Sequence, residues 1–241
     1  MDEHKICFIM CSNDEFQARE CQIYLEQLLV PDGYQAEVLV VGEAESMTSG
    51  YNEAMAATDA KYKIYLHHDV LIIKADFLFE MLALFQKYPE IGMLGVAGNE
   101  SIAKDGGMWS DGTWRRIGEL LDDRIYEKSH CLFERTKGEF AEVITLDGLL
   151  MATQYDLPWR EDLFKGWDFY DASQSVEFWK AGYKVVVPHM EEAWCLHEND
   201  VLNMSQYDVW KDTFVKEYEG YYKKWMEEHP MMRQNPEGVT M

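Results

Sequence analysis

The chain has 241 residues, of which 47% are hydrophobic and 14% aromatic, a composition that excludes a disordered chain and provides for a sizeable core. Its 22 basic residues stand against 44 acidic ones, and a surface with a formal charge of −22 repels nucleic acid and anionic lipid head groups. An anionic substrate would therefore need a bound divalent cation to neutralise it locally.

The cysteines indicate a reducing compartment. Cys7, Cys11, Cys21, Cys131 and Cys195 are odd in number and show no CxxC spacing, which favours free thiols over a disulfide framework. The N-terminus lacks the basic region of a signal peptide, and no run reaches the roughly 18 apolar residues of a membrane span. We expect a soluble cytoplasmic protein, and peripheral association with the inner membrane face stays open.

Apolar runs and helical patterns alternate through the first two-thirds of the chain. Continuous apolar runs predict strands over 5–10, 36–42, 61–70 and 91–98, and helical spacing fills the intervals between them. This alternation implies right-handed crossovers and a mainly parallel sheet. Ser12 has the spacing of a capping-box residue at the start of the first helix.

The regular pattern breaks over residues 99–142, a segment rich in Gly, Asp and Ser whose first half shows no sustained period. A core strand is predicted over 142–153. The stretch 166–188 predicts a helix followed by a strand, with Gly182 as a left-handed cap between them. An amphipathic helix over 203–229 carries an aromatic stripe that we expect to dock on the domain, with a homo-oligomer contact as the alternative.

The stretch YKIYLHHDV, residues 62–70, reads as a buried strand that ends in two imidazoles and a carboxylate. Because strand side chains alternate, His67 and Asp69 are expected to point to one face and His68 to the other. An imidazole and a carboxylate at a strand's carboxyl end form half of a divalent-cation site. His197, which follows an acidic stretch, can return to the same edge as a third ligand. The alternative is a histidine that only forms hydrogen bonds within the packing.

Other polar side chains are expected at the same edge, because ligands of such sheets bind beyond the carboxyl ends of the strands. Cys11 to Asp14 follow the first predicted strand, and Glu43 follows the second. These residues therefore become candidates for ligand contact.

The order of these motifs resembles the nucleotide-sugar-dependent glycosyltransferases of the GT-A fold, in the large and mostly inverting family 2. The resemblance covers about residues 5–200 and departs from the family pattern at His67, which replaces the first Asp of DxD, and at Trp167, which replaces the Glu of a Glu-Asp pair. The motifs that carry it are IMCSNDE, VLVVGE, GYNEAMAATDAKY, IYLHHD, LDGLLMAT, GWDFYD, AGYKVVVP and the downstream His197.

The resemblance implies an α/β fold of the GT-A, Rossmann-like type, in which helices flank a mainly parallel central sheet. An irregular acceptor-side insertion and a C-terminal helix complete it. A single domain would span 1–241, divided into a nucleotide-binding half over 1–98, an acceptor and catalytic half over 99–200 and a helical extension over 201–241.

The implied activity is transfer of a sugar from a nucleotide-diphosphate donor, with UDP favoured, to a saccharide, lipid-linked or protein acceptor in polysaccharide biosynthesis. His67, Asp69 and His197 would hold a divalent metal, with Mn²⁺ favoured over Mg²⁺ because harder cations prefer oxygen ligands. The expected nucleotide-sugar contacts are Cys11, Ser12, Asp14, Glu43, Asn52 and His68.

Asp168 matches the family's catalytic base, which takes a proton from the acceptor hydroxyl and leads to inversion. Asp171 is the alternative base, and both carboxylates also suit the first turn of a helix. The expected acceptor contacts are Asp147, Trp109, Trp114 and Trp167.

Each assignment has a purely structural alternative: a helix cap for Ser12, a solvated turn for Glu43, a helix surface for Asn52 and a loop anchor for Trp109 and Trp114. Asp147 has one too, a turn residue before Gly148.

Two other function classes stay open. Two histidines and a carboxylate also describe a non-haem iron or zinc site, which would make the protein a different metalloenzyme. A chain with altered motifs would otherwise serve as a nucleotide-sugar-binding subunit of a polysaccharide-synthesis complex. Mn²⁺-dependent turnover of a nucleotide sugar separates both classes from a transferase.

Overall fold

The computed structural model describes residues 1–102, 106, 116–124, 127–198 and 205–229. Two residues predicted to contact an acceptor, Trp109 and Trp114, lie outside the described residues.

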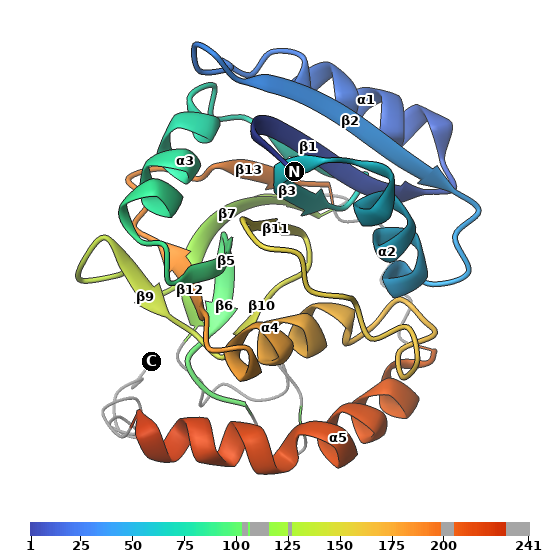
Figure 1. Cartoon of the computed structure of the whole chain (residues 1–241), viewed down its shortest axis with the longest axis vertical. Helices are drawn as coiled ribbons and strands as arrows, with labels where there is room; N and C mark the ends of the chain where they lie inside the picture. Colours follow the sequence, from blue (N-terminus) through green and yellow to red (C-terminus); the bar gives the residue numbers. More distant parts are fainter. Residues whose placement is uncertain (103–105, 107–115, 125–126, 199–204, 230–241) are drawn as a thin grey trace.

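A seven-stranded sheet forms the centre of the fold (Figure 1). Its first three strands in space are parallel, as are β5 and β12, whereas β11 and β9 run antiparallel to their neighbours. The expected mainly parallel sheet is confirmed. In spatial order the strands are β2 (Gln35–Gly42), β1 (Asp2–Ser12), β3 (Ala60–Leu66), β11 (Leu150–Thr153), β5 (Ile91–Gly95), β12 (Lys184–Pro188) and β9 (Phe140–Glu142).

The inner stretches of the central strands are mostly apolar and buried because helices cover the sheet. The side chains from Ile6 to Met10 in β1 are at most 1% exposed. In the described chain, α1 packs against β1 and β4, α2 against β1 and β2, and α4 against β10 and β12. The helices are α1 (Glu15–Leu25), α2 (Met47–Ala57), α3 (Phe77–Lys87), α4 (Tyr170–Lys180) and α5 (Tyr207–Glu228).

The long C-terminal helix α5 lies against the outer side of α4 (Figure 1). Its aromatic stripe is buried there with Phe169, Ala172 and Val176, which confirms the predicted docking face. Burial of each large apolar side chain stabilises such a contact by roughly 1.5–3 kcal/mol before ordering costs. Phe214, Tyr218 and Trp225 of the predicted stripe are buried, whereas the predicted Tyr221 is 41% exposed and Tyr222 is buried in its place.

A second, smaller sheet contains the strands that build the site. The strand predicted over 142–153 is divided among three strands. Its first residue belongs to β9 at the edge of the main sheet, its middle forms β10 in the second sheet, and only β11 enters the core of the main sheet. The spatial order is β10 (Thr145–Leu146), β6 (Ala97–Asn99), β7 (Arg116–Arg124), β13 (Cys195–His197) and β4 (Val70–Ile72), with β8 (Glu127–Leu132) paired to β7.

The segment expected to be irregular over 99–142 contains the antiparallel β7–β8 hairpin. Ile117 and Leu120 of β7 are buried, but so are the acidic residues Glu119 and Asp122. Buried carboxylates erase the apolar-polar alternation by which a strand is recognised, so the sequence pattern indicated none.

The helix ends explain two further features. The expected left-handed cap at Gly182 is confirmed by its φ of 88°, directly after the C-cap of α4. The predicted capping box at Ser12 is wrong, because α1 is capped by Asp14, whose side chain accepts from the backbone N–H of Phe16 and Gln17. Ser12 is therefore available for another contact.

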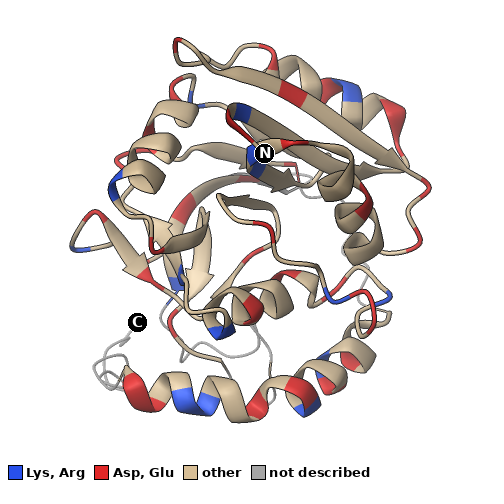
Figure 2. Ribbon diagram, viewed as in Figure 1, with Lys and Arg blue, Asp and Glu red and all other residues tan. Residues whose placement is uncertain are grey.

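Every described helix carries acidic side chains (Figure 2), whereas the buried strands β3, β5 and β11 contain none. No helix in the described ranges combines the length and apolarity that crossing a bilayer requires.

Candidate metal and nucleotide-sugar site

The HHD stretch forms a tight turn between β3 and β4. The backbone N–H of Val70 donates to the carbonyl of His67 over 3.2 Å, and the N–H of His67 donates to the carbonyl of Leu149 over 3.1 Å. The prediction that these residues alternate along a strand is wrong, since β3 ends at Leu66. The turn nevertheless brings the side chains of His67 and Asp69 together, with Nδ1 and Oδ1 3.9 Å apart.

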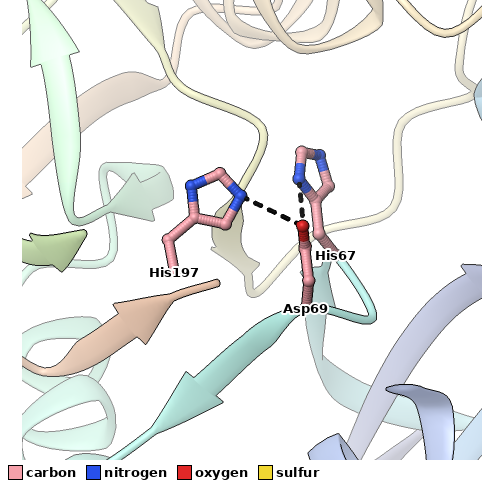
Figure 3. Close-up of side chains that lie close together, drawn as sticks. All are labelled: His67, Asp69 and His197. Carbon is pink, nitrogen blue, oxygen red and sulfur yellow. Dashed lines mark ion pairs between the residues drawn. The ribbon is translucent and has the colours of Figure 1, made fainter. Parts of the chain in front are cut away.

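His197 reaches the same place through strand pairing. Strand β13 runs antiparallel to β4 in a register that sets His197 opposite Val70. Its Nε2 lies 3.5 Å from Oδ2 of Asp69. One nitrogen of each histidine and one oxygen of Asp69 lie within 4.8 Å of one another, and Figure 3 shows both rings directed at the carboxylate.

The electrostatics of the three groups differ. Burial opposes ionisation of Asp69, but the contact with His197 and the neighbouring imidazoles hold the pKa of the carboxyl below its ordinary value. Burial lowers the pKa of His67, against the partly compensating charge of Asp69. Burial acts in the same direction on His197, where Asp69 outweighs it and raises the pKa.

The residues present fit a divalent cation. Oδ1 of Asp69 is buried and has no hydrogen-bond partner among the described residues, although a buried carboxylate oxygen is costly to leave unpaired. The Asp69 carboxylate faces two imidazole nitrogens, that of His67 at Oδ1 and that of His197 at Oδ2, and two imidazoles with one carboxylate form an accepted ligand set for Mn²⁺ and related metals.

A cleft of about 460 Å³ opens beside this cluster. It lies at the carboxyl ends of β1 and β2, where parallel sheets bind ligands. Its described lining contains no Lys or Arg, so no permanently charged basic side chain meets an anionic ligand there. The lining residues are Cys11, Ser12, Asn13, Glu43, Ala44, Met47, His67, His68, Asp69 and Trp167.

Two residues in the lining are joined by a hydrogen bond. Oγ of Ser12 lies 2.6 Å from Nδ1 of His68, so the end of β1 and the turn after β3 are fixed to each other. The sequence placed both residues near the nucleotide but contained no sign of their pairing. His68 thereby turns toward Ser12 and the cleft, whereas its neighbours His67 and Asp69 lie close to His197.

Glu43 and Trp167 line the cleft from segments that are far apart in the sequence. Glu43 has a φ of 55°, in the left-handed region that residues with a side chain rarely adopt. Such strain persists where the surrounding structure fixes it and is concentrated at functional sites. Trp167 is 53% exposed, which leaves its indole accessible to a ligand.

The remaining nucleotide candidates have other contacts. Cys11 lines the cleft, and burial raises the pKa of its thiol to about 12, so it is a neutral packing group. Asp14 caps α1. The Asn52 amide both donates to and accepts from the backbone of Trp159, over 2.9 and 2.8 Å, and Asn52 is not among the residues that line the cleft.

The sequence predicted that the two candidate bases lie on one helical turn, and this prediction is wrong. Asp168 lies before α4, separated from it by Phe169, whose φ is 61°. Burial raises the pKa of Asp168. Asp171 is in the first turn, and its oxygens accept from the N–H of Gly148 and Ala172 over 2.9 and 2.8 Å.

Burial, reinforced by the charge of Asp147, raises the pKa of Asp171 to about 7. Asp147 itself accepts from the N–H of Leu149 over 3.0 Å, the turn contact that was the structural alternative for it. The structure therefore gives both residues a part in shaping the 147–149 turn.

The sequence matches a family described as glycosyltransferase-like over residues 7–218. The chain belongs to this glycosyltransferase family. A search for similar proteins of curated function finds no match.

Solved glycosyltransferase structures share the fold. GalNAc-T7 with UDP, GalNAc and Mn²⁺ has a TM-score of 0.61 and 11% identity, with 99% of this chain and 52% of that chain covered. The mannosyltransferase PcManGT from Pyrobaculum calidifontis, with GDP-Man and Mn²⁺, has a TM-score of 0.56 and 11% identity, with 95% and 68% covered. TarS of S. aureus has a TM-score of 0.57 and 12% identity, with 93% and 42% covered.

Identities this low show the fold alone, and the chain spans about half the length of the first of these proteins. The GT-A fold class expected from the sequence is confirmed. In this glycosyltransferase, the sequence patterns missed Tyr170, whose hydroxyl contacts His67. No periodicity or motif singles it out, because its part depends on a contact between distant segments.

Proposed function

We propose that this glycosyltransferase moves a sugar from a nucleotide-diphosphate donor, with UDP favoured, to an acceptor hydroxyl. The observation that carries the proposal is the His67, Asp69 and His197 cluster at the edge of a cleft without Lys or Arg in its described lining. When bound, a divalent cation would neutralise the charge that develops on the departing nucleotide diphosphate. Mn²⁺ is favoured over Mg²⁺ because two of the three ligands are imidazoles.

The chain's own residues would bind and orient the donor. Ser12 holds His68 toward the cleft, where the imidazole can donate to a phosphate or ribose oxygen. Glu43, fixed in its left-handed conformation, offers a carboxylate to N–H or O–H groups of the nucleoside. Trp167 presents an exposed ring on which a sugar or the acceptor can pack.

We assign the catalytic base to Asp168. Its raised pKa brings the carboxylate nearer to the proton affinity that general-base catalysis needs. Asp171 is less suited, because both of its oxygens already accept backbone hydrogen bonds. Asp168 would take the proton of the acceptor hydroxyl while the acceptor oxygen attacks the anomeric carbon. The nucleotide diphosphate leaves from the opposite face, so the anomeric centre is inverted.

The acceptor is proposed only as a saccharide, lipid-linked or protein hydroxyl. Polysaccharide biosynthesis is one setting that suits such an acceptor. The alternative of an iron or zinc metalloenzyme matches the ligand set but is not favoured by the family or the fold.

A thermal-shift panel tests the proposal. UDP-sugars and GDP-sugars are added with Mn²⁺ or with EDTA, and a ligand at 100 times its dissociation constant stabilises the protein by about 2.7 kcal/mol. We expect a rise in Tm with Mn²⁺ alone, a larger one with nucleotide and Mn²⁺ together and none with nucleotide in EDTA, and hydrolysis of the same donor without acceptor. Absence of any shift would refute the proposal, whereas binding without hydrolysis would support the nucleotide-sugar-binding subunit.

A further inference from the structure

The two nitrogens of the His67 ring contact different residues. Its Nε2 lies 2.5 Å from the hydroxyl of Tyr170, while its Nδ1 faces Asp69, as the dashed line in Figure 3 shows. The two ring nitrogens therefore have different partners. A neutral imidazole carries one proton, so the partner of one nitrogen decides what the other can do.

The surroundings leave the Tyr170 hydroxyl in a defined position. The side chain is 3% exposed, and its ring packs with Tyr51 and Trp159 at centroid distances of 5.9 and 6.1 Å. Burial raises its pKa well above the ordinary value, so the group is a neutral hydroxyl. A neutral hydroxyl can accept a hydrogen bond from an imidazole N–H.

The 147–149 turn makes room for this contact. A Cβ atom on Gly148 would lie 2.0 Å from the Tyr170 hydroxyl oxygen, so any other residue would displace the ring. The carbonyl of the next residue, Leu149, accepts a hydrogen bond from the backbone N–H of His67. The N–H of Gly148 itself donates to the carboxylate of Asp171. One turn thus fixes both the backbone of His67 and the place of the hydroxyl.

We infer that Tyr170 is a positioning residue that holds the proton of His67 on Nε2, so that Nδ1 presents its lone pair to the metal. The inference rests on the proposed function, because it deepens the account of the same metal site. With the hydroxyl gone, the Nε2 proton would lose its acceptor within the protein, and the ring would lose both its tautomer preference and its orientation.

The variant Tyr170→Phe tests this inference, since it keeps the ring and removes only the hydroxyl. Mn²⁺ binding is measured without nucleotide, by electron paramagnetic resonance of the free ion. We expect the dissociation constant to rise by about 10- to 100-fold, the usual effect of losing a hydrogen-bond partner of a metal ligand. The variant Gly148→Ala, which displaces the hydroxyl without removing it, should weaken Mn²⁺ in the same direction.

Tyr51→Phe is the matched control. Tyr51 is fully buried in the same aromatic cluster, but its hydroxyl lies 3.5 Å from the carbonyl of Leu66 and contacts none of the three metal-binding candidates. Its Mn²⁺ affinity should equal that of the wild type. Thermal unfolding of the metal-free proteins shows that each variant is folded.

The outcomes separate this inference from the proposed function. If the wild type binds Mn²⁺ and folded Tyr170→Phe binds it equally well, the inference is overturned and the proposed function stands. An equal loss in Tyr51→Phe would likewise overturn it, because general packing would then explain the effect. If the wild type binds no Mn²⁺, the metal part of the proposed function fails and the inference fails with it.

Discussion

Ser12 and His68, which both line the cleft, are joined by a hydrogen bond of 2.6 Å between Oγ and Nδ1. The residues are 56 positions apart in sequence, and α1 is capped by Asp14 and not by Ser12. The first strand and the HHD turn are thereby linked at the point where the donor is proposed to bind.

Ser12→Ala should weaken donor binding without unfolding the protein. The lost hydrogen bond contributes about 0.5–1.5 kcal/mol, which corresponds to a rise of roughly 2- to 10-fold in the donor dissociation constant. Calorimetric titration with UDP and Mn²⁺ measures this. An unchanged dissociation constant would show that the His68 orientation does not depend on Ser12.

Asp14→Ala should lower stability, because two backbone N–H groups at the start of α1 lose their acceptor. The expected loss is about 1 kcal/mol in the free energy of unfolding, as for other N-cap replacements. Urea denaturation provides the measurement. Ser12→Ala serves as the comparison, and equal losses in the two variants would contradict the assignment of the cap.

Asp69→Asn should abolish tight Mn²⁺ binding, since it removes the only carboxylate among the three described ligand candidates. Metal affinity of the wild type should also rise with pH. The pKa of His197 is raised by Asp69, so a proton competes with the metal at mildly acidic pH and leaves as the pH increases. Mn²⁺ titrations across this range check the direction, and pH-independent binding would speak against His197 as a ligand.

Asp168→Asn should leave donor binding intact and reduce the rate of transfer by about 10²- to 10⁴-fold, the usual contribution of a general base. In the wild type the carboxylate must be ionised, so the rate should increase with pH through the raised pKa of Asp168. Transfer rates at saturating donor, compared with donor dissociation constants, provide the test. Equal transfer by the variant would move the base to Asp171 or elsewhere.

Asp171 should make the protein less stable as pH rises. Its pKa is raised from an ordinary value of 3.8 to about 7, mainly by burial. The folded state therefore holds the proton more tightly than the unfolded state, and stability present below pH 4 is lost as the pH approaches 7, by an amount on the order of 4 kcal/mol.

Asp171→Asn should remove this part of the pH dependence, because an amide does not titrate. Urea denaturation of both proteins between pH 4 and 8, in EDTA, measures the difference in slope. Identical slopes would place the pKa of Asp171 close to its ordinary value.

The sequence by itself determined the order of the central strands and helices, because β1, β3 and β5 are buried on both faces and read as continuous apolar runs. It also indicated the metal candidates, since an imidazole and a carboxylate two residues apart after a buried strand form half of a divalent-cation site and the order of the surrounding motifs supports that interpretation. The β7–β8 hairpin could not be read, because the buried Glu119 and Asp122 erase its alternation.

The tertiary structure alone decided how the site is assembled. The meeting of His197 with Asp69 depends on the register of β13 against β4, and the contact of Tyr170 with His67 joins residues 103 positions apart. Local patterns reflect the neighbours within a turn or a strand, whereas such contacts depend on how distant segments pack. For that physical reason the three candidate ligands could be named from the sequence, but the contact of Tyr170 with His67 could not.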